Sequence, residues 1–273
     1  MSGSLILVAT PIGNLGDMSL RGQEALTTAD LVLCEDTRKT AKLLTLLGLK
    51  APLKRCDDHV ESRLVDEVLT RLAAGQTLAL VSDAGTPLIS DPGYRLVRAV
   101  RAAGFAITAT PGPAAPILAL ILSGLPSDRF FFGGFVPTKT RARLAAFQEI
   151  ASLRATSIFF DNPKRLPATL EAAEQVFSGE RPMAFARELT KQFEEVRQGT
   201  IAEFRQELSH PMKGELVLLF GPAPAQDLRG SIDALLTKAL ATQSAASAAK
   251  EVSRLTGRPK SEVYARALQL KGS

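Results

Sequence analysis

The sequence predicts an α/β protein with two domains and a small helical appendage at its C-terminal end. Three observations predict this architecture. Short apolar runs alternate with helical patterns through the first half of the chain, as they do in proteins with parallel sheets. Breaks rich in proline and glycine, at residues 111–113 and 221–225, divide the chain into three parts. The length of 273 residues also fits about two domains of ordinary size.

The first part, residues 1–112, predicts strands and helices in regular alternation. Ser19 has the side chain and the position of a helix N-cap. Apolar runs predict strands at 5–9, 31–34, 78–81 and 106–109. Amphipathic spacing predicts helices at 19–29, 37–47, 61–74 and 94–103.

The sequence of the second part, residues 113–225, predicts a mixed sheet. More of its predicted strands follow one another without a helix between them than in the first part. The apolar runs predict strands at 130–132, 157–160, 183–186, 196–200 and 215–220. Helical patterns lie at 114–122, 141–153, 166–177 and 201–208.

The third part, residues 226–273, predicts three helices at 231–240, 245–255 and 260–270. A short turn that contains glycine joins the last two helices, which is the helix-turn-helix pattern. The formal net charge of the chain is +5, and the last 36 residues hold seven Lys or Arg against two Asp or Glu. The basic excess therefore lies in the appendage. It indicates either a polyanionic partner such as nucleic acid or a solvated helix face.

Other features exclude several classes of protein. The only cysteines, Cys34 and Cys56, form no CxxC pair, and the two histidines are too few for a histidine-rich metal centre. The chain begins without a basic segment followed by an apolar core, so no secretory signal is predicted. The longest apolar run, within 114–122, is far shorter than the ~20 residues that span a bilayer. We therefore expect a soluble cytoplasmic protein without a metal ion.

Two loops between a predicted strand and a predicted helix are candidate ligand loops. The first, residues 9–17, contains Pro11 and two glycines, but it matches neither GxGxxG nor a P-loop. The second, residues 81–93, has thirteen residues of turn chemistry where such connections usually have about two to six. Long loops at strand ends bind ligands in open α/β sheets, although an elaborate self-capping turn is the alternative here.

Three further segments carry charged side chains at the ends of predicted elements. Glu35 and Asp36 follow a strand, and Asp36 also has the position of a helix cap. Lys139 lies in the basic segment 134–143, which is either a solvated helix start or a phosphate contact. Residues 161–165, beginning with Asp161, follow another strand.

Eight motifs occur in an order that resembles one enzyme family: VATPIGNLGD, EDTR, VSDAGTPLISDPG, PGP before an apolar helix, GLPSDRFFFGGFVP, FFDNPKR, ARELTK and KGELVLL. Together they resemble the ribosomal RNA small-subunit methyltransferase I family, within the tetrapyrrole-methylase-like class of S-adenosylmethionine enzymes. The resemblance covers residues 5–221, and the basic helices are similar to the helix-turn-helix appendage of that family.

This resemblance implies a tetrapyrrole-methylase-like fold with S-adenosylmethionine in the cleft between the two α/β domains. The residues that it implies at the cofactor are Pro11, Ala84, Gly85, Thr86, Ile89, Ala114, Ala115, Asp161 and Leu189. The chain has Thr86 where the class often has Asp, and Ala114 where it often has Thr or Ser. Some cofactor hydrogen bonds are therefore expected from backbone groups.

The resemblance further implies methylation of a ribose 2′-hydroxyl, on a cytidine in the decoding centre of 16S ribosomal RNA or of the small subunit. It also implies a homodimer. The hydroxyl proton needs an acceptor, and the candidates are Glu35, Asp36, Lys139 and Lys213. A tetrapyrrole methyltransferase and a non-catalytic RNA-binding assembly factor are the alternatives.

Overall fold

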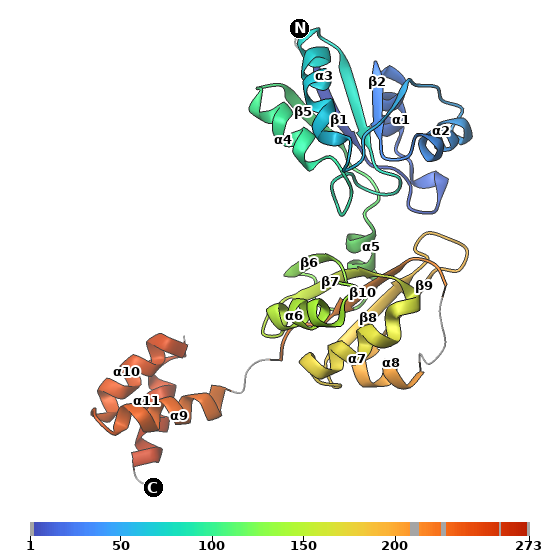
Figure 1. Cartoon of the computed structure of the whole chain (residues 1–273). Helices are drawn as coiled ribbons and strands as arrows, with labels where there is room; N and C mark the ends of the chain where they lie inside the picture. The colour runs from blue at the N-terminus through green and yellow to red at the C-terminus, as the bar shows by residue number, and fades with distance from the viewer. Residues whose placement is uncertain (1–2, 208–212, 225–227, 257, 272–273) are drawn as a thin grey trace. The chain divides into compact units, whose positions relative to one another are not determined.

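The computed structural model describes residues 3–207, 213–224, 228–256 and 258–271. Contacts divide the chain into two compact units, Met1–Pro222 and Ala223–Ser273 (Figure 1). The first unit holds two five-stranded sheets, each with its own helices, which we call the N-terminal lobe and the C-terminal lobe. The second unit is helical. The predicted α/β class with a helical appendage is therefore confirmed.

The sheet of the N-terminal lobe is entirely parallel, in the order β3-β2-β4-β1-β5. Its strands are β1 (Ser4–Val8), β2 (Leu31–Cys34), β3 (Leu53–Arg55), β4 (Thr77–Val81) and β5 (Ala106–Thr110). The helices are α1 (Leu20–Thr28), α2 (Thr37–Leu46), α3 (Glu61–Ala73) and α4 (Tyr94–Ala102). The predicted alternation of strands and helices is confirmed, and Ser19 accepts a hydrogen bond from Gly22 as the N-cap of α1.

Both faces of this sheet are covered, which explains why its strands are continuous apolar runs. Along β2, Val32 packs into a cluster with residues of α1 and α2, whereas Leu33 packs into a second cluster with residues of α3 and α4. The chain therefore leaves β1 on one face of the sheet and leaves the adjacent strand β4 on the other. This divergence opens a crevice at the carboxyl ends of β1 and β4, where open α/β sheets bind ligands.

The sequence did not predict β3. This three-residue strand reads Leu-Lys-Arg, so a single apolar residue supplied no signal, and its place at the sheet edge is set by pairing with β2.

The sheet of the C-terminal lobe is mixed, as predicted, in the order β6-β7-β10-β8-β9. Strands β6 and β7 are parallel, and β10 runs antiparallel to β7 and β8. Its strands are β6 (Phe130–Phe135), β7 (Thr156–Asp161), β8 (Pro182–Arg187), β9 (Glu195–Thr200) and β10 (Leu216–Phe220). Its helices are α5 (Ala115–Leu122), α6 (Thr140–Ile150), α7 (Leu166–Phe177) and α8 (Ile201–Glu207).

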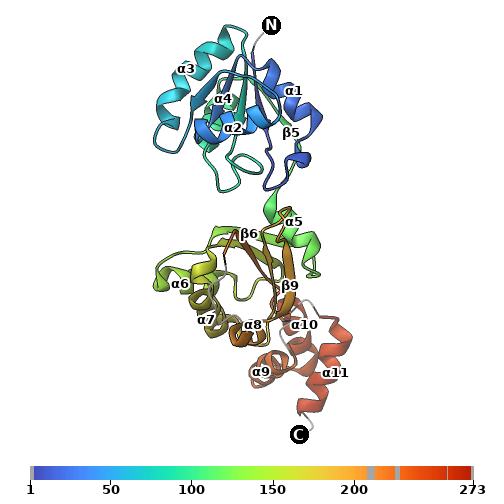
Figure 2. The ribbon, with the colours of Figure 1, turned by 90° about the vertical axis from the view of Figure 1, so that its right-hand side faces the viewer.

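Helices α6, α7 and α8 cover one face of this sheet, and α5 lies against the other (Figure 2). Along β7, Phe159 packs toward α6 and α7, whereas Ile158 packs toward α5. The cluster on the α5 face also includes Ile12, which belongs to the loop after β1. The two lobes therefore share apolar packing within the first unit.

The second unit consists of α9 (Leu228–Leu240), α10 (Ala245–Thr256) and α11 (Lys260–Lys271), so its three predicted helices are confirmed. Their core contains the fully buried side chains of Leu236, Ala248, Ala249 and Ala267, and these alanines allow the helices to approach closely. None of the helices in the described ranges is long and apolar enough to cross a membrane.

Candidate functional site

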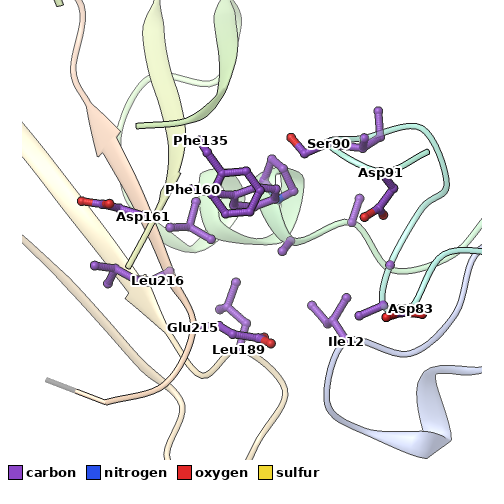
Figure 3. Close-up of a pocket in the computed structure, with 18 of the residues that line it drawn as sticks. Ile12, Asp83, Ser90, Asp91, Phe135, Phe160, Asp161, Leu189, Glu215 and Leu216 are labelled. Atoms are coloured by element: carbon purple, nitrogen blue, oxygen red, sulfur yellow. The ribbon is translucent and has the colours of Figure 1, made fainter. Parts of the chain in front are cut away.

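A cavity of about 680 Å³ lies beside the carboxyl ends of the first sheet's strands and is closed by residues of the C-terminal lobe (Figure 3). From the N-terminal lobe it is lined by Ile12, Glu35, Lys39, residues 83–86 and residues 89–91. From α5 and the C-terminal lobe it is lined by residues 114–116, Phe135, residues 160–163, Arg165, Ala186, Leu189 and residues 214–217.

The loop of residues 82–93 is held in a fixed shape by a hydrogen bond within the loop and by hydrogen bonds to two neighbouring segments. The backbones of Gly85 and Thr10 exchange two hydrogen bonds of 2.9 and 3.0 Å, which join this loop to the loop after β1. The hydroxyl of Ser82 donates to the carbonyl of Gly85 at 3.0 Å, and that of Thr86 donates to the carbonyl of Pro113 at 2.9 Å. The loop thus caps itself and lines the cavity at the same time.

Gly85 has a φ of +84°, a conformation that favours glycine. A Cβ at this position would lie 3.2 Å from Ile12 Cγ2. Leu88 and Ser90 also have positive φ values, of 71° and 65°. Backbone strain of this kind is concentrated in functional loops, where the surrounding structure maintains it.

The loop after β8 packs directly against the loop after β1. A Cβ on Gly13 would lie 2.7 Å from Thr190 Oγ1 and 3.0 Å from the carbonyl oxygen of Leu189. Only a glycine allows this approach, which brings Leu189 into the cavity wall.

Three of the carboxylates that line the cavity are neutralised by cations. Asp83 pairs with Lys39 at 2.7 Å and accepts a backbone hydrogen bond from Asp36 at 3.1 Å. Glu215 pairs with Lys191 at 3.1 Å.

The third, Asp161, has a fully buried side chain. It pairs with Arg165 at 2.8 Å and accepts hydrogen bonds from the Thr169 hydroxyl at 2.6 Å and from the Asn162 backbone at 2.7 Å. These partners occupy its oxygens, so Asp161 fixes the local structure around the end of β7.

The two remaining carboxylates, Glu35 and Asp91, form no ion pair within the described part of the chain. Burial raises the pKa of Glu35, and the negative charge of Asp83 acts in the same direction. Burial likewise raises the pKa of Asp91 to about 6, and the charges of Glu35 and Asp83 add to the increase. The positive charge of Lys39 opposes the increase at Glu35. The cavity therefore contains one carboxylate, Asp91, that takes up a proton close to neutral pH, beside a second, Glu35, that forms no ion pair.

Two family models match the chain. Residues 4–205 match the tetrapyrrole (corrin/porphyrin) methylases, and residues 226–271 match the RsmI C-terminal HTH domain. A ribosomal RNA small subunit methyltransferase I of Mesorhizobium japonicum is 44% identical over 271 residues, which are 98% of this chain and 92% of the relative. One from Xylella fastidiosa is 45% identical over 270 residues, with 96% and 98% covered. The chain belongs to the ribosomal RNA small subunit methyltransferase I family.

Solved structures show that this family's fold is shared more widely. A uroporphyrin-III-C-methyltransferase from Thermus thermophilus is 22% identical and has a TM-score of 0.57, with 84% of this chain and 98% of that chain covered. The methyltransferase CobJ is 19% identical with a TM-score of 0.60, and 81% and 95% are covered. At these identities the likeness concerns the fold, and it confirms the predicted tetrapyrrole-methylase-like architecture.

In this member of the ribosomal RNA small subunit methyltransferase I family, most of the residues predicted at the site line one cavity. These are Glu35, Ala84, Gly85, Thr86, Ile89, Ala114, Ala115, Asp161 and Leu189. Their roles stay predictions.

Four predicted residues are not part of the lining. Pro11 lies outside it, although the next residue, Ile12, lines the cavity. Asp36 caps α2 through a 2.9 Å hydrogen bond from the Arg38 backbone, as its position predicted. Lys139 lies at the N-terminal end of α6, and Lys213 is exposed next to Gly214.

Sequence reasoning did not assign Lys39, Phe135, Phe160 or Arg165 to the site, although they also line the cavity. Phe160 and Arg165 lie close to the predicted Asp161 in the sequence, so proximity to a strand end was a usable signal. Phe135 had no such signal, because its orientation depends on an irregularity in β6 that pairing with β7 reveals.

Proposed function

We propose that the chain transfers a methyl group from S-adenosylmethionine to the ribose 2′-hydroxyl of a cytidine in the decoding centre of 16S ribosomal RNA. The observation that carries this proposal is a cavity, at the crevice of a methylase fold, that combines an apolar wall with two carboxylates that form no ion pair within the described part of the chain. Relatives named for small-subunit ribosomal RNA match nearly the whole chain and support RNA as the substrate.

The residues of the cavity fit the proposed cofactor. Its volume of about 680 Å³ is in the range of about 300–1,000 Å³ found for small-molecule sites. The buried side chains of Ala186, Leu189, Leu216 and Val217 offer an apolar surface for an adenine ring. At Gly85 no Cβ fills the space beside Ile12, which leaves room for the cofactor against this part of the backbone. Carboxylates that form no ion pair also suit a ligand that carries a positive sulfonium and an ammonium group.

When bound, S-adenosylmethionine supplies a methyl group already activated by the positive sulfur. The chain's own task is then to hold the ribose hydroxyl in line with that methyl group and to receive its proton. Glu35 and Asp91 are placed for the second role, since both line the cavity and neither is paired with a cation. We propose that this pair accepts the proton. Asp36, Lys139 and Lys213 lie outside the lining, which favours the pair over them.

The appendage supports a nucleic-acid partner through basic residues that remain unpaired. Arg258 pairs with Glu262, and Arg266 pairs with Asp233, so these arginines stabilise the helical unit. Lys250, Arg254 and Lys260 are exposed and form no ion pair within the described part of the chain.

The remaining expectations belong to the same proposal. A substrate in the small ribosomal subunit implies that the protein is located in the cytoplasm. The expected homodimer would cover apolar side chains that this chain leaves exposed, among them Ile117 and Ile121, one helical turn apart on α5.

Mapping ribose methylation along 16S RNA tests the proposed function. In cells that lack this gene, we expect one cytidine of the decoding centre to lose its 2′-O-methyl group, and the intact gene to restore it. Unchanged methylation of every ribose in 16S RNA would contradict the proposal.

We expect Gly85→Val to weaken S-adenosylmethionine binding by at least about tenfold, because the side chain would occupy the space next to Ile12 in the cavity. Calorimetric titration of the folded protein measures this affinity. Gly104→Val is the matched control, since Gly104 has a similar φ of +80° but open space around its Cβ position. Equal affinity in both variants would remove the cofactor from this loop.

We expect Glu35→Gln to lower the single-turnover rate of methyl transfer by about 10²–10⁴-fold at saturating cofactor and RNA, the usual range for loss of a general base. A base works only when ionised, so the wild-type rate should fall as the pH drops through about 6, where Asp91 protonates. Neutralising Glu35 removes a charge that raises the pKa of Asp91, so this inflection should move to lower pH.

Asp36→Asn is the comparison, because this change loosens the cap of α2 without altering the cavity lining. Its rate should stay within a few-fold of wild type. A Glu35→Gln rate equally close to wild type, with an unmoved inflection, would remove the carboxylate pair from the mechanism.

We expect the combined substitutions Lys250→Gln, Arg254→Gln and Lys260→Gln to weaken RNA binding and to make its salt dependence shallower, by about 0.7 for each phosphate that is no longer neutralised. Binding titrations at several salt concentrations measure both quantities. Cofactor affinity should not change. If affinity and salt slope both match wild type, these basic residues form only a solvated helix face.

A further inference from the structure

Phe135 is the most exposed of the large apolar side chains that line the cavity. Its surface is 61% accessible, against 40% for Ile89, whereas Leu189, Leu216 and Val217 are buried. Its ring packs against Phe160 with centroids 5.2 Å apart and an interplanar angle of 54°. Figure 3 shows the two rings together, between Asp161 on one side and Ser90 and Asp91 on the other.

A bulge in β6 determines where this ring points. Phe132 pairs with Ile158 of β7, but Phe135 pairs with Phe160, so β6 has one extra residue between these two pairs. Side chains alternate between the faces of a regular strand, and an insertion of one residue reverses every side chain after it. Without the bulge, Phe135 would share the face of Phe131, which packs on Phe159 toward α6. With the bulge, Phe135 shares the face of Phe132, and both contact Phe160.

Two glycines make this bulge sterically feasible. A Cβ on Gly133 would lie 2.1 Å from the Phe159 ring, which is itself buried in the core. Gly134 has a φ of +69°, and its Cβ position lies 3.6 Å from Ser90 Oγ in the N-terminal lobe. The bulge therefore lies beside the ligand loop, and local backbone geometry turns an aromatic ring toward the cavity instead of the core.

The exposure of the ring indicates which ligand it meets. The enclosed apolar wall is suited to a small cofactor that enters completely. A long RNA cannot enter, and only a nucleotide that leaves its stack can reach the cavity. Proteins hold such unstacked bases on exposed aromatic rings.

We infer that Phe135 is a substrate-binding residue whose ring stacks on the base of the unpaired target nucleotide, so that its ribose faces the cofactor. This inference rests on the proposed function, because it needs an RNA substrate. The exposed surface of the Phe135 ring is the surface that the base would cover.

The full-length protein and small ribosomal subunits from cells that lack the gene provide the test. Wild-type protein first has to transfer a labelled methyl group to the subunits; if it does not, the proposed function fails. Given that activity, Phe135→Ala should raise the subunit concentration for half-maximal rate by about 5- to 150-fold, the range for loss of one stacked base. Cofactor affinity, measured by calorimetry, should stay within twofold.

Three further variants separate stacking from other effects. Phe135→Trp keeps an aromatic face and should restore half-saturation to within a few-fold of wild type, whereas Phe135→Leu keeps apolar bulk and should not. Phe193→Ala removes a ring that is also exposed, at 67%, but does not line the cavity, so it should behave as wild type. The inference is overturned if Phe135→Ala leaves half-saturation unchanged, if Phe135→Leu restores it, or if the loss falls on cofactor affinity instead.

Discussion

The pair of backbone hydrogen bonds between Thr10 and Gly85 is the contact on which the site depends. It joins the loop after β1 to the loop after β4, the two strands between which the crevice opens. The chain leaves these strands on opposite faces of the sheet, so nothing in the regular packing of helices would hold their loops together. The exchange of two peptide hydrogen bonds supplies that link, and the positive φ of Gly85 makes it feasible. Ile12 is thereby held against the C-terminal lobe, which continues the cavity wall.

The class of fold and the approximate extent of nearly every element could be predicted from the sequence, because each depends on local apolar periodicity. The exception is instructive. Strand β3 is one apolar and two basic residues, and its conformation comes from pairing with β2, a non-local contact that leaves no pattern along the chain. The sequence predicted that the second sheet is mixed, but it did not predict that β10 lies between β7 and β8.

The candidate site was predictable to the extent that strand ends are recognisable. Glu35, residues 84–86 and Asp161 each follow a predicted strand. Strands β2 and β4 are parallel neighbours in the first sheet, and β7 lies in the interior of the second sheet, so these residues line one cavity. The sequence could not show which carboxylate is best placed to accept the proton, because this depends on ion-pair partners that are distant in the sequence. Lys39 forms its ion pair with Asp83, forty-four positions away, and Glu35 and Asp91 form none within the described part of the chain. Phe135 was equally hidden, since a one-residue bulge decides which face of the strand carries its ring.

Unpaired carboxylates in a partly closed cavity lower the stability of the folded state. The pKa of Asp91 is raised to about 6, so its ionised form destabilises the folded state. A group with a raised folded-state pKa contributes most to stability below its unfolded pKa and loses that contribution as the pH rises through about 6. At neutral pH the cavity therefore retains negative charge at the expense of stability. A positively charged ligand would offset the repulsion between Glu35, Asp83 and Asp91, and its binding would become weaker as Asp91 protonates. Tight cofactor binding and proton acceptance would then depend on the same uncompensated charge.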